Sequence, residues 1–98
     1  MTDTTLQNQT VTKTATISLW NLILLNDDFT PIDFVMQVLI ELCGKTDQEA
    51  YAITMDIHNT GRGVVSTYTE EIAKQKAHDI TLIAAQNKHP LKAIAEEA

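Results

Sequence analysis

The chain contains 98 residues and carries a formal net charge of -6. This length allows one domain with a small core but not two. The acidic balance argues against a nucleic-acid partner, because binding phosphates requires clustered Lys and Arg. The single cysteine, Cys43, excludes an intramolecular disulfide framework and fits a reducing compartment. No apolar run approaches the roughly 20 residues that span a bilayer, so we expect no membrane partner.

Residues 1–16 differ in composition from the rest of the chain. They are rich in Thr, Gln and Asn and contain few apolar side chains. Such a segment cannot bury enough surface to offset the entropy lost on ordering. It also lacks the basic start and apolar centre of a secretory signal peptide. We therefore expect a flexible N-terminal extension at 1–16 and a core domain at 17–98.

The core domain begins with a predicted strand and a predicted helix. Residues 17–25 are almost continuously apolar, which favours a strand covered on at least one face. Asn26 to Phe29 interrupt this pattern with loop-forming side chains. Thr30 followed by Pro31 predicts a helix with Thr30 as its N-cap and Pro31 at its first position. Gly44 ends this helix.

A second helix is predicted directly afterwards. Thr46 and Glu49 have the spacing of a capping box, and Gly61 stops the helix. Residues 64–68 then predict a strand. We expect His58 to lie in the last turn of the helix, where its simplest role is that of an exposed side chain near the C-terminal end.

The last two elements are a helix and a short strand. Thr69 is the expected cap of a helix over residues 70–86, with Ile72 among its inward-facing residues. The pair His89-Pro90 prevents the helix from continuing, and residues 91–95 predict the final strand. The order β-α-α-β-α-β indicates an α+β sandwich, with three helices packed on a small three-stranded antiparallel sheet.

The residue inventory argues against an enzyme. Asp27 and Asp28 are adjacent, and in an extended loop their side chains diverge, so they form a poor acid–base pair. Three histidines and one cysteine are too few and too scattered for a standard zinc site. We expect no catalytic residue, no metal and no cofactor. Binding of a cation by Asp27, Asp28 and His58 is an alternative that metal-dependent stabilisation would support.

One polar cluster still calls for an explanation. Asn26, Asp27 and Asp28 follow the first strand and precede a helix. Asn and Asp are ordinary turn-forming residues, which gives this cluster a purely structural interpretation. However, Thr30 is already the expected cap, so three further polar side chains exceed what the helix start needs.

The chain resembles a known family at several motifs. These are the stretch NDDFTPIDFVMQVL from Asn26 to Leu39, then His58, Gly61 and a C-terminal HPL at His89 to Leu91. Together they are similar to the ClpS adaptor family, whose fold has the same element order. The resemblance runs from about Trp20 to the C-terminus and is specific, although NDD alone would be weak.

The resemblance implies that the protein is an adaptor for N-degrons. Such an adaptor binds a free N-terminal Leu, Phe, Tyr or Trp and delivers the substrate to a ClpA- or ClpC-type AAA+ unfoldase for degradation by ClpP. The implied protein is a cytoplasmic monomer of bacteria or, alternatively, a protein of the plastid stroma. The resemblance assigns the α-amine to Asn26, Asp27, Asp28 and His58, the hydrophobic pocket to Ile32, Val35, Thr54, Ile57 and Leu91, and unfoldase docking to Glu71 and Lys76.

Two positions depart from the family pattern. Thr54 and Ile32 lie where the family often has Met. A shorter polar residue reshapes the pocket floor, and a β-branched residue is stiffer than Met. The ranking among the four first residues therefore stays open. A structural or protein-interaction module of the same small fold, without N-degron binding, is the main alternative function.

Overall fold

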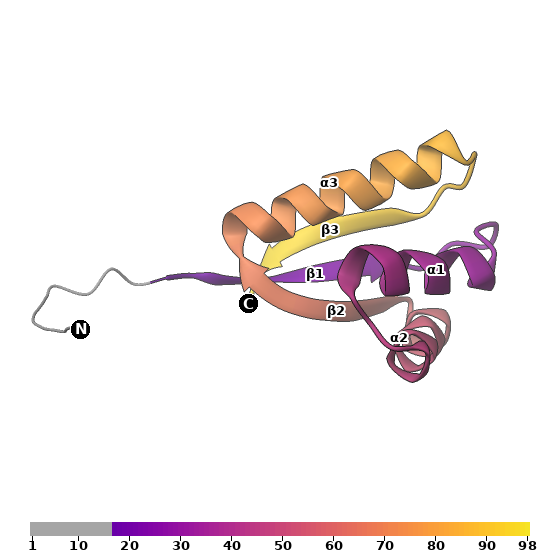
Figure 1. Cartoon of the computed structure of the whole chain (residues 1–98), viewed down its shortest axis with the longest axis horizontal. Helices are drawn as coiled ribbons and strands as arrows, with labels where there is room; N and C mark the ends of the chain where they lie inside the picture. Colours follow the sequence, from indigo (N-terminus) through magenta and orange to yellow (C-terminus); the bar gives the residue numbers. More distant parts are fainter. Residues whose placement is uncertain (1–16) are drawn as a thin grey trace, which may run out of the picture.

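The computed structural model describes residues 17–98, so the expectation for residues 1–16 lies outside the described part. The predicted element order is confirmed, and the bounds are β1 (Leu19–Leu25), α1 (Ile32–Cys43), α2 (Asp47–Thr60), β2 (Arg62–Thr69), α3 (Glu70–Gln86) and β3 (Lys92–Glu97) (Figure 1). The first strand begins two residues later than predicted. Leu91, predicted as the start of the last strand, lies just before it.

The sheet is antiparallel, with the order β2-β1-β3. Because β1 is central, it is the most buried strand: Leu22 and Leu24 are fully buried in the core. Ile23 points to the other face, where its register partners Val64 and Ile94 flank it, and it is only 2% exposed. Burial of both faces explains why this strand is almost continuously apolar.

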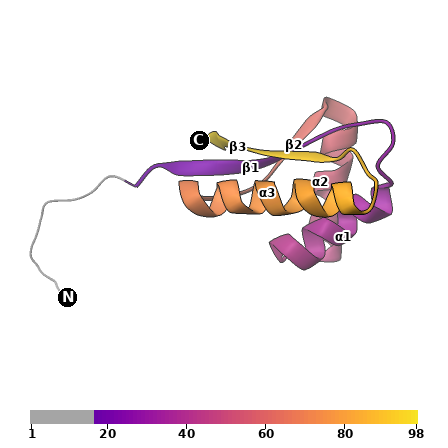
Figure 2. The ribbon, with the colours of Figure 1, turned by 90° about the horizontal axis from the view of Figure 1, so that it is seen from above.

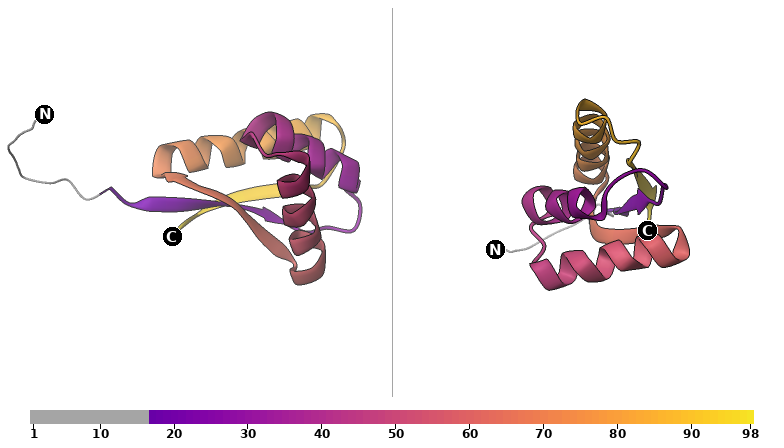
Figure 3. Two further views of the ribbon diagram at one scale, coloured as in Figure 1. Left: turned by 60° about the horizontal axis from the view of Figure 1, so that its bottom comes forward. Right: turned by 90° about the vertical axis from the view of Figure 1, so that its right-hand side faces the viewer.

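The three helices are arranged so that α1 lies between α2 and α3 (Figure 3). Helix α3 runs along the sheet, and α1 lies on the same side of the sheet (Figure 2). The alanines at 73, 77 and 84 of α3 are buried, and small side chains allow a helix to approach a sheet closely. Ile72 was expected on this inner side but is 47% exposed, so that assignment was wrong.

A close contact holds α2 against β2. Gly63 is buried, and a Cβ atom at this position would lie 2.6 Å from Cγ1 of Ile57. Real Cβ atoms essentially never approach this closely, so glycine is needed for the helix to lie where it does. The register of β1 against β2 shifts nearby, between Leu22 and Ile23.

The helix caps differ from the sequence prediction at two of three positions. Pro31, not Thr30, is the N-cap of α1, and it has no side-chain cap. The assignment of Thr30 was wrong because the helix begins at Ile32, one residue later than predicted. The Thr30 hydroxyl donates to the carboxylate of Asp27. Thr69 occupies the N-cap of α3 as expected, but its side chain makes no capping hydrogen bond. Thr46 and Glu49 form the complete capping box that the sequence predicts.

The contrast between Thr46, which makes a capping hydrogen bond, and Thr69, which does not, can be tested with one substitution at each position. Thr46→Ala removes a capping hydrogen bond of 3.1 Å and should lower the free energy of unfolding by about 1 kcal/mol. Thr69→Ala removes no such bond and should change it by less than about half that amount. Urea denaturation of both variants measures the difference, and equal losses would contradict this account of the caps.

Candidate functional site

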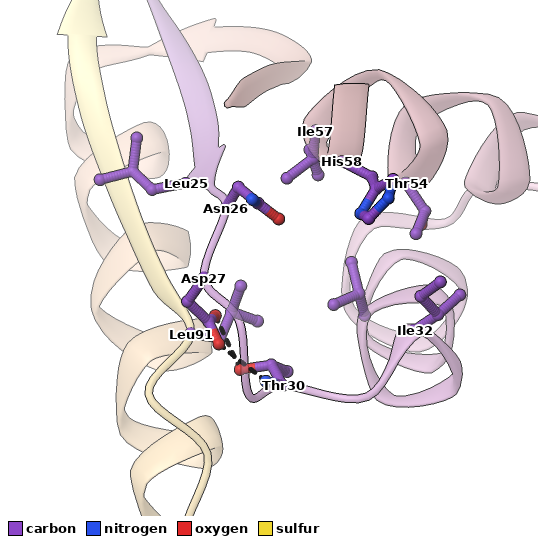
Figure 4. Close-up of a pocket in the computed structure, with 10 residues that line it drawn as sticks. Leu25, Asn26, Asp27, Thr30, Ile32, Thr54, Ile57, His58 and Leu91 are labelled. Atoms are coloured by element: carbon purple, nitrogen blue, oxygen red, sulfur yellow. Dashed lines mark hydrogen bonds between the residues drawn. The ribbon is translucent and has the colours of Figure 1, made fainter. Parts of the chain in front are cut away.

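A pocket lies where β1 runs into the loop before α1 (Figure 4). It is bounded by this loop, the first turn of α1, one face of α2 and the residue before β3. The structure brings together all of the predicted amine-binding and hydrophobic residues except Asp28, which is exposed and does not line the pocket. The lining residues are Leu25, Asn26, Asp27, Thr30, Ile32, Val35, Thr54, Ile57, His58 and Leu91.

The loop is joined to α2 through its backbone. The backbone N–H of Asn26 donates to the carbonyl of Gly61 at 2.9 Å. Gly61 is the C-cap of α2, and its left-handed φ of 94° suits glycine. His58 lies in the last turn of this helix, so the same bond brings Asn26 towards it. Figure 4 shows the Asn26 amide facing the part of α2 that carries Ile57 and His58.

Asp27 organises the loop itself. Its Oδ1 accepts hydrogen bonds from the backbone N–H groups of Phe29, at 2.8 Å, and Thr30, at 2.7 Å. Its Oδ2 accepts from the Thr30 hydroxyl at 2.8 Å (Figure 4). The sequence interpretation that the polar cluster exceeds structural needs is therefore wrong for Asp27, whose carboxylate performs the turn-forming role.

The hydrogen bonds also set the charge of this carboxylate. Burial alone would raise the pKa of Asp27, but the bonds from Thr30 and Phe29, aided by the positive charge of His89, together hold it below its ordinary value of 3.8. Asp27 is therefore ionised at neutral pH. It leaves one oxygen, Oδ2, with remaining acceptor capacity at the pocket rim.

The interior of the pocket is apolar. Val35, Ile57 and Leu91 are each at most 7% exposed and form its walls. Ile32 is different: it is 45% exposed and lies at the rim. Thr54 is the buried polar residue of the lining, at 3% exposed, and Figure 4 shows it on the side of α2 towards Ile32. These residues surround a hydrophobic pocket whose polar groups, Thr54 aside, lie at the mouth.

The pocket is small in this conformation. Its cavity volume is about 50 Å³, whereas a cavity that holds benzene measures about 150 Å³. An aromatic side chain would therefore enter only after the rim opens. Ile32 is the apolar lining residue with the most freedom to move, because nearly half of it faces solvent.

The groups that line the pocket are suited to binding a ligand. Asn26 and His58 are exposed, so the amide oxygen and the nitrogen of a neutral imidazole are accessible acceptors beside the Asp27 carboxylate. Acceptors at the mouth of an apolar pocket suit a ligand that carries a cationic N–H group next to a hydrophobic side chain.

Within residues 17–98, no three His, Cys, Asp or Glu side chains are placed to hold a metal ion. Burial raises the pKa of the Cys43 thiol, which disfavours a nucleophilic thiolate.

Comparison with known proteins decides the family. The model of the family described as "ATP-dependent Clp protease adaptor protein ClpS" matches residues 15–94. The chain belongs to the ClpS family. The ClpS adapter of Deinococcus radiodurans is 42% identical over 92 residues, which cover 92% of this chain and 81% of that protein. The Helicobacter hepaticus ClpS adapter is 46% identical over 79 residues, which cover 81% of this chain and 80% of that protein.

A solved structure shows the same fold with a ligand. Agrobacterium tumefaciens ClpS2 bound to L-phenylalaninamide superposes with a TM-score of 0.83 at 30% identity, covering 85% of this chain and all of that one. ClpS family members are adaptors of the Clp protease rather than catalytic proteins. In the described part of the chain, no helix is long and apolar enough to cross a membrane.

Sequence reasoning missed two lining residues, Leu25 and Thr30. Leu25 directly precedes the loop that carries Asn26 and Asp27, and Thr30 belongs to that loop. Their closeness in sequence to Asn26 and Asp27 could have indicated that they line the pocket. Leu25 was interpreted only as the end of a strand. Thr30 was interpreted as a helix cap, but the cap position is held by Pro31.

The lowered pKa of Asp27 predicts a dependence of stability on pH. Because the carboxyl is more acidic in the folded state, its contribution is present above the ordinary value of 3.8 and is lost as the pH falls through the lower folded-state value. Asp27→Asn should therefore lower the free energy of unfolding by about 1 kcal/mol at pH 7 and weaken its decrease towards pH 2.

Asp28→Asn is the matched control for this prediction. It removes the same charge without touching the three hydrogen bonds to Asp27. Urea denaturation should show a free energy of unfolding at pH 7 close to that of the wild type. An Asp27→Asn variant as stable as Asp28→Asn at pH 7 would contradict the role given to Asp27.

Proposed function

We propose that this protein binds polypeptides that begin with a free α-amino group and a bulky hydrophobic residue, namely Leu, Phe, Tyr or Trp. It then delivers them to a ClpA- or ClpC-type unfoldase for degradation by ClpP. The observation that carries the proposal is the pairing of accessible hydrogen-bond acceptors with an apolar interior in one pocket. The ligand of the Agrobacterium protein supports it, since L-phenylalaninamide has both a free α-amine and a hydrophobic side chain.

The mouth of the pocket matches the chemistry of an α-ammonium group. Such a group offers three N–H donors, and the rim offers the Asn26 amide oxygen, the His58 ring nitrogen and Oδ2 of Asp27. Asp28 does not line the pocket, so in this proposal it acts through its negative charge and not by contact. Acetylation removes the charge and two donors, so a blocked N-terminus should be rejected.

The interior supplies the hydrophobic part of the affinity. Transfer of a Leu or Phe side chain into the pocket is worth about 1.5–3 kcal/mol. Hydrogen bonds to a charged group add roughly 1.5–3 kcal/mol each, before the costs of ordering and association are subtracted. An affinity near 1 μM, about 8 kcal/mol, fits these magnitudes and lets an adaptor release its cargo.

The proposed docking surface for the unfoldase lies on α3. Glu71 is exposed in the first turn of α3, and this turn lies at the opposite end of the sheet from the pocket (Figure 1). Lys76 is half-buried, and its ammonium group donates to the carbonyl of Leu42 at 3.0 Å, at the end of α1. Lys76 therefore has a structural contact beside its proposed docking role, whereas the Glu71 side chain makes no hydrogen bond or ion pair with another of residues 17–98.

Peptide binding tests the proposed function directly. A fluorescent peptide starting with Leu or Phe should bind with near-micromolar affinity, and its acetylated or Gly-initiated form should bind at least tenfold more weakly. Asn26→Ala and His58→Ala should each weaken binding of the free peptide about tenfold or more. Both residues are exposed, so neither change should unfold the protein. Fluorescence anisotropy measures these affinities.

Asn59→Ala provides the control, because Asn59 is exposed beside His58 and does not line the pocket. It should bind the peptide like the wild type. If the acetylated and free peptides bound equally, the amine-recognition proposal would fail. Absence of binding by every peptide would favour the alternative of a protein-interaction module without N-degron binding.

The rim residue Ile32 predicts which first residues are excluded. A β-branched first residue is wide at Cβ, where Ile32 at the rim and Val35 in the pocket wall leave little room. Ile32→Ala should raise the affinity for Val- and Ile-initiated peptides about fivefold or more relative to a Leu-initiated peptide, because the steric conflict is relieved. Ile32→Val keeps the branch and should change this ratio little. Equal ratios in both variants, again by anisotropy, would count against this steric gate.

A further inference from the structure

Thr54 lines the pocket, and its side-chain hydroxyl is a buried, unpaired polar group. Thr54 is only 3% exposed, and its Oγ1 makes no hydrogen bond with any group of residues 17–98. Buried hydroxyl groups are nearly always paired, because an unpaired one loses its bonds to water without compensation. Because Thr54 lines the pocket, a polar group on a ligand that enters beside it is a candidate for the partner that residues 17–98 do not supply.

The position of Thr54 indicates where that partner must lie. Thr54 precedes His58 by four residues, so the two side chains lie one turn apart on the same face of α2, and both line the pocket. His58 is exposed at the mouth, and Thr54 is buried. The helix side of the pocket lining also includes the apolar side chains of Ile32, Val35 and Ile57. A partner for the hydroxyl must therefore be carried by the far end of the ligand side chain.

The geometry points to Thr54 as a specificity-determining residue that hydrogen-bonds the phenol of an N-terminal tyrosine and so favours Tyr over Phe. This inference rests on the proposed function. Among the four expected first residues, Leu and Phe have no polar atom in the side chain. The tyrosine hydroxyl lies at the end of the ring opposite the backbone, and it both donates and accepts, as threonine does.

Binding sites discriminate unequally between a ligand that has a hydroxyl group and one that lacks it. A purely hydrophobic pocket discriminates weakly against an added hydroxyl, whereas a site that hydrogen-bonds a ligand hydroxyl disfavours the analogue that lacks it. With phenylalanine in the pocket, the Thr54 hydroxyl stays buried and unpaired. With tyrosine, both hydroxyls are paired, so the preference should equal the value of one neutral hydrogen bond, about 3- to 10-fold in affinity.

The test compares two peptides that differ only in the first residue, Tyr or Phe. The wild type should bind the Tyr peptide about 3- to 10-fold more tightly. Thr54→Val has nearly the same shape without the hydroxyl and should bring the affinity ratio close to one. Thr54→Ser keeps the hydroxyl and should retain a preference for Tyr. A ratio that Thr54→Val leaves unchanged, or a wild type that prefers Phe, would overturn the inference.

A stability measurement separates this effect from damage to the fold. Replacing an unpaired buried hydroxyl by a methyl group removes a destabilising feature, so Thr54→Val should melt at the same temperature as the wild type or higher. A clearly lower melting temperature would show that the hydroxyl has a partner within the protein, and would overturn the inference. If both free peptides bind but their ratio does not depend on Thr54, only this inference fails. If neither binds, the proposed function fails with it.

Discussion

The site depends on the hydrogen bond between the Asn26 backbone and Gly61. This bond joins the end of the central strand to the C-terminus of α2. Asn26 itself lines the pocket, and Gly61 follows the lining residue His58 by three positions. Two glycines make the junction possible. Gly61 adopts the left-handed conformation that ends α2, and Gly63 leaves room for Ile57. Without this close approach, the amide of Asn26 and the imidazole of His58 would not share one pocket.

The three polar residues of the loop have separate roles. Asp27 uses its carboxylate to hold the turn through Phe29 and Thr30, and this is why its pKa is low. The side chain of Asn26 faces the pocket. Asp28 is exposed and does not line the pocket. The charge that holds the loop in shape therefore also lies at the mouth of the pocket. In the proposed function this negative charge attracts the α-ammonium group before any direct contact forms.

The pocket walls belong to the hydrophobic core, and this links binding to stability. Val35, Ile57 and Leu91 are buried in the same cluster as the central strand. Substitutions there would disturb both the core and the pocket. Ile32 is half-exposed at the rim, so changes there cost the fold little. Thr54 is buried, but its hydroxyl is unpaired within residues 17–98, so replacing that hydroxyl by a methyl group costs little as well. They are the positions where specificity can change most independently of stability.

Local sequence signals determined much of this protein. The apolar run before Asn26, the capping box at Thr46 and the breaks at Gly44 and Gly61 act over a few residues, so the element order and the antiparallel α+β fold were predictable. Most of the assignments that failed depended on how the helices, strands and loops pack against one another. The hydrogen bond from Thr30 to Asp27 spans only three residues, so it was a local signal that the cap assignment overlooked. Only the tertiary structure decided that Ile72 faces solvent, that Asp28 does not line the pocket and that the Thr54 hydroxyl has no partner within residues 17–98. Each of these outcomes depends on which groups meet in space, and residue spacing along a single chain does not contain that information.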